Sequence, residues 1–138
     1  MQITFNLPHV FSGESSNDTE NAETLRALLD LMVHLNVDYL ETHPQTPSLY
    51  RSGVVYARTT WWEPIPALYA RKKGDCKSLA TARVAELLLA GVPAKVVFRF
   101  VRSSERGLLY HVLVQTPSGF EDPSKILGMG QHENAILI

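Results

Sequence analysis

The hydrophobic residues of this chain change their spacing once, and the change separates a helical part from a strand part. Segments 22–41 and 76–90 carry apolar residues three and four positions apart, which is the spacing of an amphipathic helix. Segments 94–101 and 108–115 alternate their side chains from one face to the other, which is typical of strands, and a short third strand is expected at 120–122. Helices followed by an antiparallel meander predict an α+β fold.

Capping and turn residues mark the ends of the two helices. Asp18 or Asn21 is expected to cap the first helix, and the sequence His43–Pro47 ends it. Asp75 is expected to cap the second helix, and Gly91 follows its last turn. Both helices therefore have defined limits.

The remaining segments have weaker patterns. Residues 48–73 are irregular apart from an extended piece at 54–58, and two prolines keep 62–66 out of a helix interior. Edge strands are expected at 1–11 and at 135–138.

Composition predicts a single globular domain over residues 1–138, because 45% of the residues are hydrophobic and 20% are charged. The net charge of −1 gives no overall attraction to nucleic acid or to acidic membranes. Residues 1–50 hold seven acids and one base, whereas residues 51–138 hold twelve bases and seven acids. This asymmetry either favours docking of the two parts or marks two solvated faces.

The N-terminal sequence and the cysteine content predict a soluble, cytoplasmic protein. The first residues have neither the basic nor the apolar region of a signal peptide, and no apolar run approaches the ~20 residues of a membrane span. A single cysteine excludes an internal disulfide. The five histidines have no metal-ligand spacing, so we expect no metal site.

Cys76 occupies the first turn of the second predicted helix, directly after Gly74 and Asp75. The helix dipole and the basic residues at 71–73 favour a thiolate, which predicts a pKa below the ~8.5 of a free cysteine. Gly74 is expected to leave room for a substrate. From position alone, Cys76 is equally compatible with a reactive nucleophile and with a buried, inert thiol.

Two residues on the predicted strands favour the reactive nucleophile over the inert thiol. His111 lies in the middle of a strand on an otherwise apolar face, where an unpaired imidazole is costly. Asp122 lies on the next strand across a short turn, within reach of a histidine on its neighbour. A thiol, a histidine that accepts its proton and an acid that orients the histidine together form the arrangement used in nucleophilic catalysis.

Three motifs resemble the transglutaminase-like core of the papain-like cysteine enzymes. They are GDCKSLATARVAELLLAG at 74–91, the VPAKVV that follows, and YHVLVQTPSGFEDPS at 110–124. The resemblance covers about residues 60–124, which we take as the catalytic core, with 1–45 as an N-terminal strand and helix segment. It implies a papain-like fold in which the nucleophile helix packs on an antiparallel sheet.

The resemblance also implies an activity. Cys76 would be the nucleophile, His111 the general base and Asp122 the residue that orients it, in a cofactor-free acyl transfer from a peptide or protein amide through a thioester. Compact bacterial and phage members of the family resemble peptidases and amidases. Only the segment 43–66 is available to exclude water, so hydrolysis is favoured, with amine transfer by a transglutaminase and a non-catalytic binding module as the alternatives.

Two tryptophans precede the cysteine, and each has two possible roles. In the resembling family an upstream indole can donate to the oxyanion, which would suit Trp61 or Trp62, whereas large aromatics also pack junctions between segments. The sequence departs from the family pattern at Lys77-Ser78 and at Lys95. These departures leave the substrate preference open.

Overall fold

A computed structural model describes residues 18–103 and 107–130 of the chain. Its elements, in chain order, are α1 (Asp18–Thr42), the 3-10 helix η2 (Leu49–Arg51), β1 (Val55–Tyr56), α2 (Ile65–Arg71), β2 (Lys73–Gly74), α3 (Cys76–Leu89), β3 (Lys95–Ser103), β4 (Gly107–Thr116), β5 (Gly119–Glu121) and α4 (Pro123–Ile126). Among these described residues, no helix has the length and apolar character needed to cross a membrane. The strands predicted at 1–11 and 135–138 lie outside the described residues.

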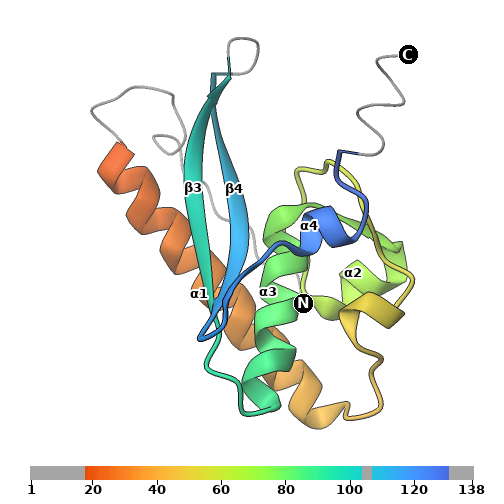
Figure 1. Cartoon of the computed structure of the whole chain (residues 1–138). Helices are drawn as coiled ribbons and strands as arrows, with labels where there is room; N and C mark the ends of the chain where they lie inside the picture. Colours follow the sequence, from red (N-terminus) through yellow and green to blue (C-terminus); the bar gives the residue numbers. More distant parts are fainter. Residues whose placement is uncertain (1–17, 104–106, 131–138) are drawn as a thin grey trace.

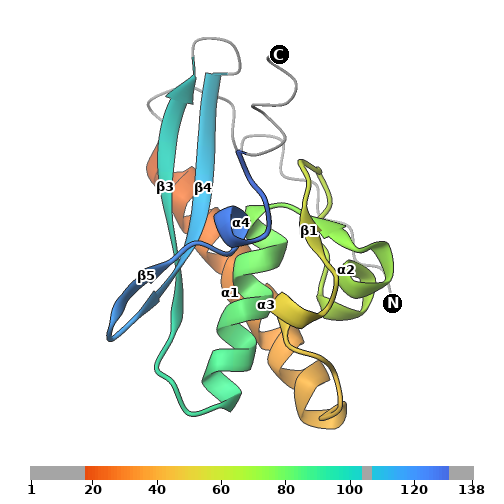
Figure 2. The same ribbon diagram turned by 45° about the vertical axis from the view of Figure 1, so that its right-hand side comes forward.

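Three antiparallel strands form the main sheet, in the order β3-β4-β5. The β3–β4 pairing runs from Lys95 opposite Gln115 to Ser103 opposite Gly107. β5 is much shorter and pairs only with residues 114–116 of β4, so Figure 2 shows it beside one end of the hairpin. The predicted meander and the α+β class are confirmed.

α3 lies between two hydrophobic clusters and is the centre of the fold (Figure 1). The first cluster joins α3 to α1 and to the sheet, and its buried members are Leu25, Leu29, Cys76, Ala80, Val84, Val96, Val112 and Val114. The second joins α3 to the segment between α1 and β2, and its buried members are Leu49, Val54, Ile65, Leu68, Leu79 and Ala82. The helix predicted to carry the nucleophile therefore packs on the antiparallel sheet, as the family resemblance implies.

The prediction of a single apolar stripe on α3 is wrong. Every residue from Cys76 to Ala82 is buried, including three polar side chains, whereas Leu88 near the other end is exposed. The second cluster causes this difference, because it covers the face of α3 that an amphipathic surface helix would turn toward water. Residues 48–73, which have no regular pattern in the sequence, pack against this face of α3.

α2 was not predicted, and its position explains why. Pro64 stands at its N-cap and Pro66 in its first turn, where proline is tolerated because the first amides of a helix have no partner within it. The two prolines thus begin a helix instead of only interrupting one. The chain then passes Lys72, which adopts the left-handed conformation with φ of 62°, and enters β2.

β1 and β2 pair in parallel, and this pairing fixes the segment that leads into α3. Tyr56 pairs with Gly74, and the amide of Ala57 donates to the Gly74 carbonyl at 2.9 Å. The space expected for a substrate at Gly74 is instead filled by protein, since a Cβ at this position would collide with the Leu68 side chain. Gly74 therefore allows α2 to approach α3 closely.

Replacing Gly74→Ala should lower the free energy of unfolding by about 1–3 kcal/mol, because the added methyl group overpacks a buried contact. Urea denaturation of the two proteins measures the loss. In the Leu68→Ala background the same substitution should cost much less, since truncation of Leu68 makes room for the methyl group. Additive effects of the two substitutions would contradict this account of Gly74.

Candidate active site

Cys76 is the first residue of α3 and its thiol is buried, with 9% of the residue exposed. It belongs to the same cluster as Val112 on β4, and the backbone amide of Val112 faces the thiol. β5 does not extend alongside Val112, because it pairs only with residues 114–116 of β4. The helix start thus meets β4 one residue away from His111.

His111 and Asp122 are in direct contact. The Nε2 atom of His111 lies 2.9 Å from Oδ2 of Asp122. Both side chains are mostly buried, with 16% and 18% exposed. Because an ionised carboxylate only accepts hydrogen bonds, the contact assigns a proton to Nε2 and leaves Nδ1 as the basic nitrogen of the ring.

The sequence analysis placed Asp122 within the third strand of the sheet. In the structure it lies directly after the end of β5. It is the N-cap of α4, and its Oδ1 accepts a hydrogen bond from the Lys125 amide at 3.3 Å. Pro123, the next residue, is the first residue of α4. One carboxylate therefore both caps a helix and binds the imidazole.

The three predicted residues are brought to one region of the fold, but they are not all bonded to one another. In the described part of the chain, no hydrogen bond joins the Cys76 thiol to the His111 ring. No three His, Cys, Asp or Glu side chains in this part of the chain are grouped as metal ligands. The site offers a buried thiol, an oriented imidazole and a carboxylate.

The expectation of a lowered thiol pKa is wrong for this structure. Burial is the largest influence, and together with the charge of Asp75 it raises the pKa of Cys76 to about 11. The Val112 amide and Lys77 act in the opposite direction and do not compensate. The favourable helix N-terminus is outweighed because the sulfur has lost most of its contact with water.

A buried ion pair flanks the thiol. The Lys77 amine binds a carboxylate oxygen of Asp75, and the other oxygen of Asp75 is buried without a partner. Lys77 also donates to the Thr59 carbonyl at 3.3 Å, and its amine lies 5.6 Å from the centre of the Trp62 ring. Burial raises the pKa of Asp75, an effect that Lys77 partly offsets.

Sequence reasoning missed this pair and two tyrosines near the thiol. Burial raises the pKa of Tyr56 and Tyr110, and in both cases the charge of Cys76 contributes because the side chains lie close to the sulfur. A lysine in a helix is usually solvated, and Tyr110 follows the ordinary alternation of its strand. Neither pattern distinguishes these residues from structural ones.

The two candidate tryptophans lie in different surroundings. Trp62 packs against the hydrophobic cluster that contains Cys76. Trp61 is 57% exposed, and the Arg71 guanidinium lies 5.6 Å from the centre of its ring. The fold thus distinguishes two residues that the sequence could not rank.

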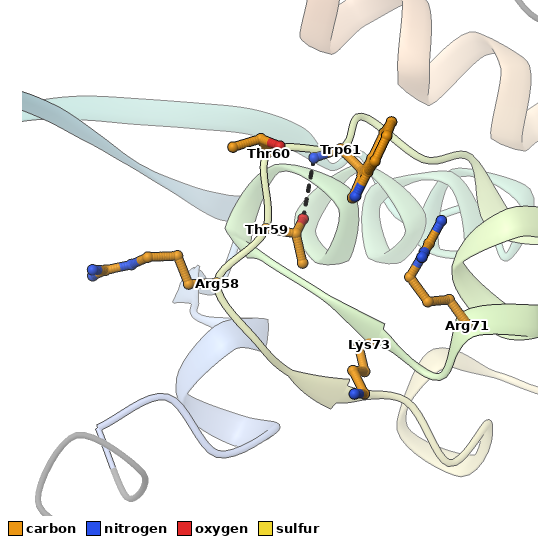
Figure 3. Close-up of a pocket in the computed structure, with 6 residues that line it drawn as sticks. All are labelled: Arg58, Thr59, Thr60, Trp61, Arg71 and Lys73. Carbon is orange, nitrogen blue, oxygen red and sulfur yellow. Dashed lines mark hydrogen bonds between the residues drawn. The ribbon is translucent and has the colours of Figure 1, made fainter. Parts of the chain in front are cut away.

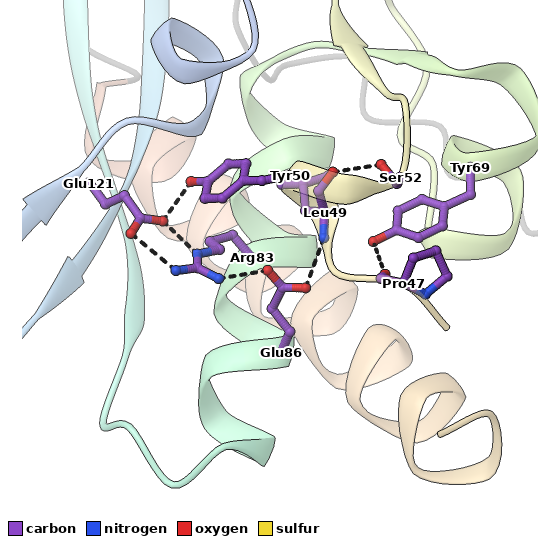
Figure 4. Close-up of polar contacts among 8 residues, drawn as sticks. All are labelled: Pro47, Leu49, Tyr50, Ser52, Tyr69, Arg83, Glu86 and Glu121. Carbon is purple, nitrogen blue, oxygen red and sulfur yellow. Dashed lines mark hydrogen bonds and ion pairs between the residues drawn. The ribbon is translucent and has the colours of Figure 1, made fainter. Parts of the chain in front are cut away.

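A polar network ties β5 to α3 (Figure 4). Arg83 on α3 donates to both oxygens of Glu121, at 2.6 and 3.3 Å, and also to Glu86 at 2.8 Å. The Tyr50 hydroxyl donates to Glu121 at 2.6 Å, and Glu86 accepts from the Leu49 amide at 3.0 Å. The network anchors the residue before Asp122 to the helix that begins with Cys76.

The network stabilises the charged form of Glu121. Burial by itself would raise the pKa of Glu121, but the hydrogen bonds from Arg83 and Tyr50 outweigh it and the pKa is lowered. A lowered carboxyl pKa contributes stability that is present above the pKa of the unfolded chain and is lost as the pH falls through the folded value.

Replacing Arg83→Met should lower the free energy of unfolding by about 1–3 kcal/mol at neutral pH, since two partly buried carboxylates lose their cation. The difference from the parent protein should narrow on acidification, as Glu121 becomes protonated. Chemical denaturation at several pH values tests this. The control is Asp30→Asn, which removes an exposed ion pair with Arg26 at 3.6 Å and should cost less than about 0.5 kcal/mol. Equal effects of the two substitutions would contradict the role of Arg83.

The raised pKa of Cys76 predicts slow alkylation at neutral pH. The thiol is protonated below its pKa, so the rate of reaction with iodoacetamide should keep rising from pH 7 toward a midpoint near pH 11. The same protein in denaturant is the control, because its thiol should titrate near ~8.5. A rate in the folded protein that is already constant below pH 7 would show a preformed thiolate.

Comparison with known families agrees with the motifs around these residues. The sequence model of the transglutaminase-like superfamily matches residues 11–121, a span that includes Cys76 and His111 and ends one residue before Asp122. Neither the curated proteins nor the solved structures contain a match to the chain. The family match covers more than half of the sequence and the fold has the mixed helix and sheet composition that it implies. The chain therefore belongs to the transglutaminase-like superfamily, whose members are in general cysteine-based acyl-transfer enzymes.

Proposed function

We propose that the protein is a cysteine-dependent amidase or peptidase in which Cys76, His111 and Asp122 form a catalytic triad. The observation that carries the proposal is the 2.9 Å contact between His111 Nε2 and Asp122 Oδ2, next to the strand residue that faces the thiol. A buried imidazole held by a carboxylate, with its other nitrogen basic, is the general base that a protonated thiol requires.

The resting thiol is protonated, so attack begins with proton transfer. Nδ1 of His111 accepts the thiol proton as the sulfur bonds to the amide carbonyl carbon, giving a tetrahedral intermediate. This intermediate collapses with cleavage of the carbon–nitrogen bond, and the imidazolium gives its proton to the leaving amine. Asp122 holds the ring and stabilises its positive charge through both steps.

Water completes the cycle. The imidazole removes a proton from water as its oxygen attacks the thioester, and the carboxylic acid leaves as the thiol is protonated again. An amine in place of water would make the enzyme a transglutaminase. Hydrolysis is favoured because Trp61 and Thr60, near the end of the segment expected to exclude water, are exposed.

Stabilisation of the oxyanion is assigned to the Cys76 amide and to Trp62. The first amides of a helix have no partner within it, and Cys76 begins α3. Trp62 packs against the cluster around Cys76, whereas Trp61 is largely exposed. An indole N–H only donates hydrogen bonds and therefore suits an oxygen that gains negative charge.

A glutamine-containing peptide offered together with a labelled primary amine tests the activity. Ammonia release should exceed amine incorporation at millimolar amine, and mass spectrometry should detect an acyl group on Cys76 during turnover. Dominant incorporation would make the protein a transglutaminase. Failure of a broad panel of amides to acylate Cys76 would reject the enzyme and favour the non-catalytic binding module.

Variants of the triad provide the controls. Cys76→Ala should abolish both products, and His111→Ala should lower kcat by about 10²–10⁴-fold, the usual range for loss of a general base. Asp122→Asn keeps a hydrogen-bond acceptor and should retain more activity than Asp122→Ala. If Asp122→Ala were as active as the parent protein while folded normally, Asp122 would have no place in the triad.

A further inference from the structure

Two consecutive side chains in the first turn of α3 reach across to the segment that carries Trp62. The Lys77 amine donates to the Thr59 carbonyl at 3.3 Å, and the Ser78 hydroxyl accepts from the Glu63 amide at 3.3 Å. These contacts attach the backbone three residues before Trp62 and one residue after it. Lys77 and Ser78 are the positions at which the sequence departs from the family pattern, so that pattern does not account for the attachment.

Lys77 is buried, although lysine side chains are usually solvated. Only 3% of its side chain is exposed. Its amine binds a carboxylate oxygen of Asp75 and the Thr59 carbonyl, and it lies over the Trp62 ring, 5.6 Å from the ring centre. An ammonium is attracted to the face of an indole, and the attraction is stronger away from water. Lys77 therefore joins the residue before Cys76 to the segment of Trp62.

The neighbouring Trp61 is supported differently. Its ring is 57% exposed, and Figure 3 shows it near Arg71, whose guanidinium lies 5.6 Å from the ring centre. Trp62 packs instead against the hydrophobic cluster that contains Cys76. The two indoles thus contact different cations, and the one on the side of the thiol is the one that Lys77 contacts.

We propose that Lys77 is a positioning residue that holds the Trp62 indole beside Cys76, where its N–H can donate to the oxyanion. This proposal rests on the proposed acyl-transfer function and adds a residue that takes no part in the proton transfers. A donor is most effective when it is already in place as the negative charge develops, because no reorganisation is then needed. A buried cation attached to the start of α3 provides that fixed support.

The competing explanation is that Lys77 only neutralises Asp75. A buried carboxylate without a cation is costly, so a lysine would be useful here even without any effect on Trp62. The double variant Asp75→Asn/Lys77→Met distinguishes the two explanations, because it removes both charges and leaves no unpaired carboxylate to destabilise the fold. Neutralisation predicts that the double variant resembles the parent protein. The positioning role predicts that it resembles Lys77→Met.

NMR relaxation of the indole groups tests the placement without a substrate. Trp62→Phe assigns the two indole signals. In Lys77→Met and in the double variant, the heteronuclear NOE of the Trp62 indole nitrogen should fall as the ring becomes mobile, while that of Trp61 should stay unchanged. Lys73→Met, which removes an exposed lysine on β2, is the matched control and should affect neither signal. An unchanged Trp62 value in folded Lys77→Met, or a parent-like value in the double variant, would overturn the proposal.

Turnover tests whether this placement serves catalysis. Lys77→Met should lower kcat by about 10- to 100-fold with little change in KM, because the oxyanion forms only after the substrate has bound. In the Trp62→Phe background, which lacks the indole donor, the same substitution should lower kcat by less than about twofold. A loss of the same size in both backgrounds would show that Lys77 does not act through Trp62 and would overturn the proposal.

The two measurements separate this inference from the proposed function. A more mobile Trp62 together with an effect on kcat that depends on the indole supports both. A more mobile Trp62 in a protein that no amide acylates keeps Lys77 as the residue that holds the indole, and rejects both the acyl-transfer function and the oxyanion role. Turnover by the parent protein, with a Trp62 ring that stays ordered in Lys77→Met, keeps the function and rejects the role of Lys77.

Discussion

Burial of α3 on two opposite faces is the constraint on which the other features depend. The first turns of this helix contact α1 and the sheet on one side and the segment between α1 and β2 on the other. A helix held in this way cannot rotate or slide without disrupting both clusters, because protein interiors are close-packed. Cys76 is consequently fixed against β4, and Gly74 must be small for α2 to complete the second cluster.

The same burial sets the chemistry of the thiol. Removing the sulfur from water disfavours its charged form more than the helix N-terminus and Lys77 favour it, so the pKa rises. In the proposed mechanism such a thiol depends on a base, the role assigned to His111, which contacts Asp122. The network around Arg83 joins β5 to α3, so both parts of the proposed triad are held on one rigid unit.

The two charged residues next to Cys76, Asp75 and Lys77, are buried as well. Asp75 and Lys77 are both largely excluded from water, which is costly for isolated ions and is offset here by their mutual contact. Outside this shielded pair, Arg58, Arg71 and Lys73 line a pocket beside β2 (Figure 3). The chain thus combines a buried thiol with basic side chains a few residues away.

The two long helices, the strands of the main sheet and the superfamily were predictable from the sequence by itself. Helical spacing at 22–41, capping residues around 76–90 and alternation at 108–115 act over short distances along the chain, and the motifs at Cys76, His111 and Asp122 indicate the superfamily. The depth at which Cys76 lies, the separate surroundings of Trp61 and Trp62, and the pairing of Lys77 with Asp75 were decided only by the tertiary structure. Burial and charge pairing depend on the packing of segments that are distant in the sequence. A local pattern therefore does not indicate which side chains this packing excludes from water.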